Sequence, residues 1–209
     1  MGRHTAELQM RDHFARTDLR AGQAELTWHL LIEDPEVVRT LARWRGSLAG
    51  AEHLAPVADE GLHLTMQVVG LLDALPADAP ARVASAVRDR LRGLGPVTVE
   101  LTRPEVVEDG VVVGVRDDTA LQQLRAAIRA GVADAGLEIS DGDDWWPHVT
   151  LAYSTTEATG ESTREALAVA AEDPAGPPAL TVQRVSLLAQ RMEPPTYVWD
   201  VLDAVELSA

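Results

Sequence analysis

Two short strings share a pattern that constrains the fold of this chain more than any other feature. Each sets a His-x-Thr triplet in an apolar run with the alternation of a β-strand, one starting at His63 and the other 85 residues later at His148. Successive strand side chains point to opposite faces, so His63 and Thr65 share one face. His148 and Thr150 do the same in the second string. If the two strands lie next to each other across a groove, two imidazoles and two hydroxyls converge on one small volume.

This set of groups fits acid and base chemistry on a phosphoester. The ordinary pKa of His lies near neutrality, so one imidazole can take a proton from an attacking hydroxyl while the other protonates the departing oxygen. The hydroxyls of Thr65 and Thr150 can donate to a nonbridging phosphate oxygen as charge gathers there. Such a site predicts a bell-shaped pH profile and needs no metal or cofactor. The pattern leaves open which His is the base.

Composition narrows the class of ligand. The chain has 209 residues, with 18 basic residues against 33 acidic ones and a net charge of −15. Binding of long RNA or DNA depends on basic residues that neutralise phosphates, so this balance argues against a general nucleic-acid binder and leaves a small phosphorylated ligand possible. No Cys is present, which excludes thiolate catalysis and Cys-based metal sites. No apolar run reaches the ~18 residues of a membrane span, so we expect a cytoplasmic protein without a membrane partner.

The hydrophobic pattern predicts an α+β fold. Residues 1–22 are expected to form a flexible arm, and 23–209 a single bilobal domain with lobes of roughly 23–97 and 98–209. Strand exchange between the lobes is left open. The pattern predicts strands at 26–32, 62–69, 96–103, 110–115, 148–154, 180–190 and 196–205, and helices at 36–48, 78–94, 118–135 and 161–171. The order suggests a diverged duplication, with two mixed or antiparallel sheets and flanking helices around a central groove.

Candidate substrate-binding residues lie near both motif strands. Gln67 falls on the face of His63 by parity and either binds a phosphate or base edge or is a solvated polar residue. Trp28 and His29 are neighbours, so only one can face the groove, and we expect His29 to be packed and Trp28 to face it.

Other candidates carry two interpretations each. Arg191 and Tyr197 flank a Pro-Pro turn that could close over an anionic ligand, although Arg191 is equally consistent with a surface charge. Trp145 and Trp146 either stack on a ligand ring at the groove mouth or cap the core, and the core is slightly favoured. Two further residues are assigned no role in the site: Tyr153 faces the core by parity, and His13, in the terminal stretch, is solvated.

The tandem His-x-Thr pattern, its spacing and the duplicated α/β order resemble the two-histidine (2H) phosphoesterase superfamily, which includes bacterial 2′-5′ RNA ligase-like proteins. The resemblance covers about 26–207. The following segments also resemble an actinobacterial branch of the superfamily: 10–13, 27–30, 62–67, 147–154 and 197–199. The resemblance implies a bilobal fold with a central groove, catalytic residues at His63, Thr65, His148 and Thr150, and hydrolysis of a cyclic nucleotide phosphate or related 2′-5′ phosphodiester without metal.

The sequence therefore predicts a hydrolase, a phosphodiesterase that opens a 2′,3′- or 1″,2″-cyclic phosphate or a related small nucleotide phosphodiester. Two alternatives remain: a specialised-metabolism enzyme acting on a nucleotide-derived intermediate with the same scaffold, and a noncatalytic nucleotide-binding module. Hydrolysis and ligation are not distinguished by these residues, and neither are RNA repair and specialised metabolism.

Overall fold

The computed structural model describes residues 8–17, 19–139, 145–171 and 176–208, and within them it has four α-helices and eleven strands. The helices are α1 (Pro35–Gly46), α2 (Ala79–Leu91), α3 (Thr119–Asp134) and α4 (Glu161–Ala171). The longer strands are β2 (Ala24–Leu31), β4 (His63–Leu71), β5 (Val97–Val107), β6 (Gly110–Val115), β7 (His148–Ser154), β9 (Ala179–Val182), β10 (Arg184–Glu193) and β11 (Thr196–Glu206). Short elements complete the chain: β1 (Gln9–Met10), β3 (Leu54–Pro56), β8 (Ala158–Thr159) and the 3-10 helices η1 (Asp59–Gly61) and η2 (Leu72–Ala74).

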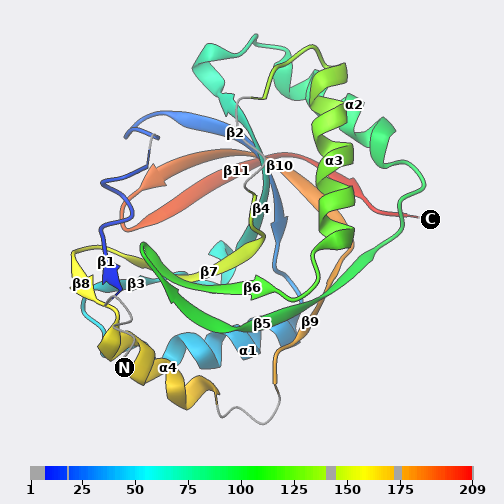
Figure 1. Cartoon of the computed structure of the whole chain (residues 1–209). Helices are drawn as coiled ribbons and strands as arrows, with labels where there is room; N and C mark the ends of the chain where they lie inside the picture. Colours follow the sequence, from blue (N-terminus) through cyan, green and yellow to red (C-terminus); the bar gives the residue numbers. More distant parts are fainter. Residues whose placement is uncertain (1–7, 18, 140–144, 172–175, 209) are drawn as a thin grey trace, which may run out of the picture.

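The long strands form one curled antiparallel sheet in the order β11-β10-β2-β4-β7-β6-β5-β9 (Figure 1). At its middle, β4 and β7 pair through a single residue pair, Leu64 opposite Val149, which divides the sheet into two halves of four long strands each, with the short β3 also paired to β7. The α+β prediction with antiparallel sheets about a groove is confirmed. The C-terminal strands β10 and β11 lie beside β2, so the end of the chain completes the sheet that its first half begins.

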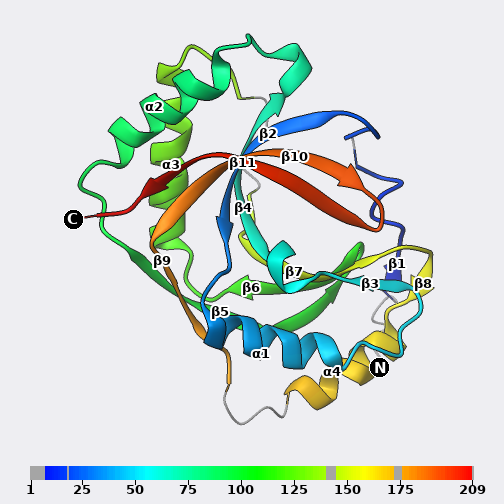
Figure 2. The ribbon, with the colours of Figure 1, turned by 180° about the vertical axis from the view of Figure 1, so that it is seen from behind.

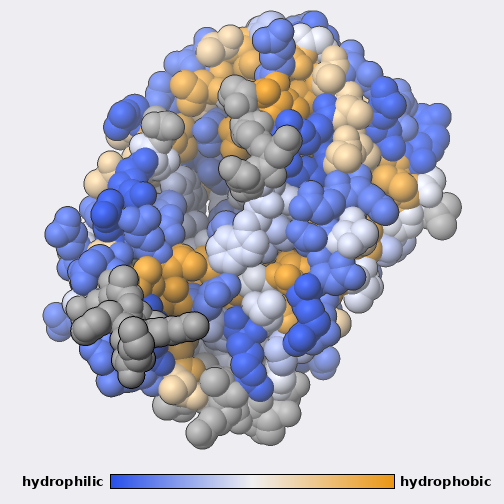
Figure 3. All heavy atoms as spheres, in the orientation of Figure 1, coloured by the Kyte–Doolittle hydropathy of each residue, from blue (hydrophilic) through white to orange (hydrophobic). Residues whose placement is uncertain are grey.

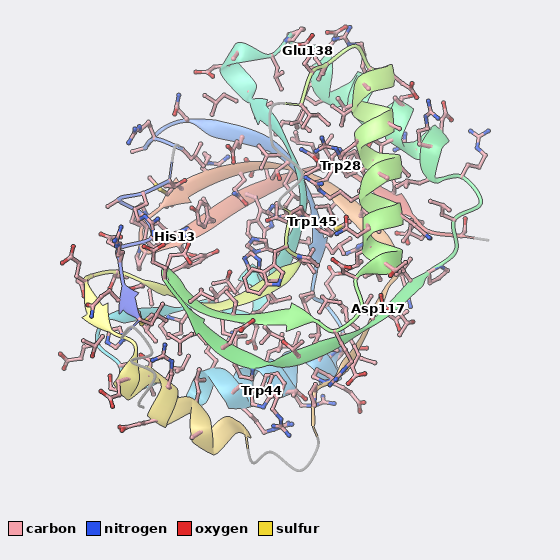
Figure 4. The ribbon with its side chains drawn as sticks, viewed as in Figure 1. His13, Trp28, Trp44, Asp117, Glu138 and Trp145 are labelled. Atoms are coloured by element: carbon pink, nitrogen blue, oxygen red, sulfur yellow. The ribbon has the colours of Figure 1, made fainter. Side chains whose placement is uncertain are left out.

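Two helices cover each half of the sheet (Figures 1 and 2). α2 and α3 pack together against the half that contains β4 and β11, and α1 and α4 pack against the half that contains β5 and β7. Helix α1 shows the local cause: Asp34 accepts hydrogen bonds from the backbone N–H groups of Glu36 and Val37, and Pro35 starts the helix. Its apolar stripe, which includes the fully buried Trp44, faces the core (Figure 4).

The described part of the N-terminal arm is packed, which corrects the expectation of a flexible arm there; residues 1–7 and 18 lie outside the described residues. β1 pairs with β8, and the Met10 side chain is fully buried. The His13 N–H donates to the Ser154 carbonyl at 2.9 Å. These paired residues are about 140 to 150 positions apart, so no local sequence pattern predicts the contacts.

The segment 180–190, predicted as one strand, is two. β9 pairs with β5 at one end of the sheet, whereas β10 pairs with β2 and β11 in the other half. The chain therefore passes from one half to the other at Gln183, between the two strands.

The surface is dominated by hydrophilic side chains on the face that Figure 3 shows, with smaller hydrophobic groups between them. No helix in the part of the chain that the structure describes has the length and apolar character needed to cross a membrane.

The crossing of α2 and α3 depends on a glycine. A Cβ at Gly131 would lie 2.7 Å from the Cα of Val87, closer than real contacts allow. We expect Gly131→Ala to lower the free energy of unfolding by about 1 to 3 kcal/mol, because the helices must move apart. The matched control is Gly46→Ala in α1, where a Cβ meets nothing within 4 Å, and which should gain up to about 1 kcal/mol. Urea denaturation of both variants measures the difference, and equal effects would contradict the tight crossing.

Candidate functional site

The two motif strands meet at one pocket. His63 and Thr65 on β4, with His148 and Thr150 on β7, line a cavity of about 150 Å³. The antiparallel pairing of Leu64 with Val149 explains this, since it sets each His of one strand across from the Thr of the other. Four more side chains complete the lining: His13, Tyr153, Gln190 and Tyr197. We refer to these eight residues as the paired-His pocket.

The two motif imidazoles are held in the same way. His63 Nδ1 lies 2.8 Å from the Gly61 carbonyl oxygen, and His148 Nδ1 lies 2.9 Å from the Trp146 carbonyl oxygen. Each carbonyl belongs to the residue two positions before the His. A carbonyl only accepts, so each Nδ1 must carry the proton, an assignment that rests on the hydrogen bonds. Each Nε2 is then the atom left for the pocket.

The surroundings of His63 keep it neutral. Burial lowers its pKa to about 4, the hydrogen bond to Gly61 opposes this shift, and the nearby His148 lowers the pKa further. At neutral pH the His63 Nε2 is therefore an unprotonated base.

A third imidazole, that of His29, packs against the His63 ring. His29 is fully buried on β2, and its ring stacks on His63 with centroids 4.3 Å apart and planes 8° apart. Its Nε2 lies 3.3 Å from Thr65 Oγ1. Burial, and then His63, hold the pKa of His29 well below its usual range. If the His29 proton is on Nε2, His29 donates to Thr65 and the Thr65 hydroxyl proton is left for a ligand.

The expectation that Trp28 faces the groove in place of His29 is wrong. Trp28 is fully buried in the core, on the face of β2 opposite to His29 (Figure 4). The two neighbours take opposite faces as expected, but it is His29 that lies beside the pocket residues.

A β-bulge follows the Thr of each motif and changes the parity of both strands. Met66 is the extra residue between Thr65 and Gln67 in the pairing of β4 with β2, and Leu151 is the extra residue in the pairing of β7 with β6. Strand alternation therefore holds through each His-x-Thr triplet and fails after it.

The bulges correct two assignments. Gln67 does not line the pocket: it is buried, and its Oε1 accepts a hydrogen bond from Arg129 on α3 at 2.9 Å. Tyr153 shows the reverse effect, because parity places it in the core and it lines the pocket instead. Its phenol pKa is raised by burial. A two-residue period cannot show where a strand bulges, so the sequence contains no signal for either position.

The two Trp residues before the second motif have different surroundings. Trp145 Nε1 donates to the Thr65 carbonyl oxygen at 2.9 Å, and the Arg125 guanidinium lies over its ring at 5.1 Å. Arg125 Nε in turn donates to the Met66 carbonyl oxygen at 2.9 Å. These donors satisfy backbone groups at the bulge and so fix the position of Thr65. Trp146 is 45% exposed and stacks on the His148 ring, with centroids 4.8 Å apart.

The Pro-Pro turn brings only one of its two candidates to the pocket. Tyr197 lines it, with its hydroxyl 2.8 Å from His13 Nε2. Arg191 lies on the other face of β10 and pairs with Asp200 at 2.7 Å, so it does not reach the pocket. His13 and Gln190 are pocket residues that the sequence does not indicate.

Metal-ligating side chains are not clustered in the described ranges, where no group of three or more His, Asp or Glu residues is placed to hold an ion.

Two antiparallel half-sheets that meet over paired His-x-Thr strands define a two-histidine phosphoesterase fold. A model of the 2′-5′ RNA ligase superfamily matches residues 33–192, so the chain belongs to this superfamily.

Solved structures share the fold at low identity. The structure of E. coli LigT complexed with NADP+ has a TM-score of 0.66 and 20% identity, covering 90% of this chain and 99% of that one. TT0787 of Thermus thermophilus has a TM-score of 0.66 and 18% identity, covering 88% and 98%. A structure described as a phosphoesterase has a TM-score of 0.67 and 21% identity, covering 90% and 99%. No curated protein matches the chain in sequence.

Proposed function

We propose that the protein is a metal-independent phosphodiesterase that hydrolyses a 2′,3′- or 1″,2″-cyclic phosphate or a related small nucleotide phosphodiester. The observation that carries the proposal is the convergence of two imidazole Nε2 atoms on one pocket, each set by a backbone hydrogen bond. E. coli LigT has been crystallised with NADP+, 3′-AMP, ATP and phosphate, which supports a small nucleotide as the ligand. At about 150 Å³ the pocket fits a phosphate group and leaves the rest of a nucleotide outside it.

The surroundings of the two imidazoles favour His63 as the base. His63 is neutral and takes a proton from water, whose oxygen attacks phosphorus. The imidazolium of His148 then gives its Nε2 proton to the departing ribose oxygen, and the phosphodiester becomes a phosphomonoester. The Thr65 and Thr150 hydroxyls donate to the nonbridging oxygens, where negative charge increases in the transition state.

This assignment predicts the acid side of the pH profile. We expect kcat/KM to rise with pH and to reach half of its plateau near pH 4, because the pKa of His63 in the free enzyme is about 4. The measurement is kcat/KM from pH 3.5 to 8 on an active substrate. An acid limb with its midpoint between 6 and 7 would contradict a base whose pKa is held near 4.

A substrate panel tests the function itself. The panel holds 2′,3′-cyclic mononucleotides, 2′-5′ dinucleotides and a 1″,2″-cyclic ADP-ribose phosphate, with the product's phosphate position determined by NMR. We expect turnover of at least one, unchanged by EDTA. Tight binding across the panel without turnover would replace the proposal with a nucleotide-binding module, and activity lost in EDTA and restored by zinc or manganese would replace it with metal catalysis.

A further inference from the structure

One wall of the paired-His pocket comes from residues outside 33–192 or near the end of that range: His13, Gln190 and Tyr197. Gln190 is 9% exposed, and its Oε1 is buried without a hydrogen-bond partner among the described residues. A buried acceptor without a partner is costly, so such an atom facing a pocket indicates that a ligand donates to it.

The Tyr197 hydroxyl is held by the N-terminal segment. Asp109 Oδ2 lies 3.0 Å from His13 Nδ1, and the hydrogen bond from His13 lowers the pKa of this carboxyl. The carboxylate accepts, so His13 Nδ1 carries a proton, and His13 Nε2 lies 2.8 Å from the Tyr197 hydroxyl. This hydroxyl also bonds to the Thr17 side chain, so both of its partners come from the N-terminal segment.

The N-terminal segment fixes His13 in this place (Figure 4). The Arg11 N–H donates to the Glu108 carbonyl at 2.7 Å, next to Asp109. The His13 ring also packs against Tyr153 in a tilted arrangement, with centroids 4.5 Å apart. The N-terminal segment therefore contributes His13 to the pocket wall, although it lies outside the range that matches the superfamily.

The pocket has donors in the two Thr hydroxyls and an acceptor without a partner in Gln190 Oε1. We propose that Gln190 forms an acceptor subsite that binds the ribose hydroxyl next to the phosphate, which a 1″,2″-cyclic phosphate or a 2′-5′ phosphodiester carries free and which a 2′,3′-cyclic phosphate releases when it opens. The inference rests on the proposed function for the identity of the phosphate group.

Binding measurements test the subsite without relying on turnover. By calorimetry, the wild type should bind 3′-AMP, which has a 2′-hydroxyl beside its phosphate, about tenfold more tightly than 2′-deoxy-3′-AMP. Gln190→Leu should reduce this ratio to about threefold or less, because the acceptor is removed.

Inorganic phosphate and two matched variants provide the controls. Phosphate affinity should change by less than about twofold in Gln190→Leu, which also shows that this variant folds. Arg191→Gln, beside Gln190 on the other face of β10, and Arg11→Gln, two residues from His13, should keep the tenfold ratio. Equal binding of both nucleotides by the wild type, or an unchanged ratio in Gln190→Leu, would overturn the subsite. Absence of phosphate binding in the wild type would instead count against the proposed function.

Discussion

Replacing either motif histidine is expected to lower kcat by about 10²- to 10⁴-fold on any substrate that the panel identifies. His63→Ala removes the base and His148→Ala removes the acid, and general acid or base catalysis contributes factors of this size. The two losses should not multiply in the double variant, because both groups act in one step. Steady-state kinetics on the three variants gives the measurement.

The control for these variants is His53→Ala. His53 bonds to Thr163 at 2.9 Å and does not line the pocket, so its loss should leave kcat within about twofold of the wild type. Full activity in either motif variant would remove the assignment. Circular dichroism on each protein separates a chemical loss from unfolding.

Acid should destabilise the fold as pH falls from 6.5 towards 4. The pKa of His63 is about 4 in the folded state against an ordinary value of 6.5, so between these pH values the unfolded chain binds the additional proton. The free energy of unfolding from this group is present above pH 6.5 and is lost as pH falls towards 4, by about 3 kcal/mol. The pKa of His29 is lowered as well, which adds a loss of the same sign.

Urea denaturation at pH 7 and pH 4.5 measures the effect, with His63→Gln as the matched variant. The variant should lose less stability than the wild type between these values. The carboxyl pKa values of Asp109, Asp117 and Asp134 are lowered below 3.8, so their contributions are lost at more acidic pH and do not obscure the His window. The same loss in wild type and variant would contradict the neutral buried His63.

The two-residue period of a β-strand places the motif residues correctly, but it fails within two positions after the Thr of each motif. The His-x-Thr triplets obey the two-residue period, and the structure brings His63, Thr65, His148 and Thr150 together. The bulges that follow them depend on how the strands curl and on donors from α3 and the Trp145 segment, which lie about 60 to 80 residues away. No local pattern encodes such partners, so the parity assignments of Gln67 and Tyr153 are wrong.

The residues of the pocket wall cannot be predicted from local sequence patterns, for a related reason. His13 has hydrogen-bond partners 96 and 184 residues away, in Asp109 and Tyr197. From the sequence alone, a single His in a charged terminal stretch is expected to be solvated, and only the fold shows that this one is packed. Gln190 likewise lies in a run that the pattern predicts as one strand, and only the separate pairing of β10 shows which of its faces lies over the pocket.

The single pairing of Leu64 with Val149 has a consequence for how this catalyst can be tuned. The two imidazoles belong to separate half-sheets, and the distance between the imidazoles depends on this one backbone pair, where the half-sheets join. The side chains of both paired residues are fully buried in the core and lie outside the pocket lining. The volume of these two apolar side chains therefore influences the distance between the two imidazoles. Substitutions at these two positions, in natural variation or in design, can change that distance while the proposed acid and base stay the same.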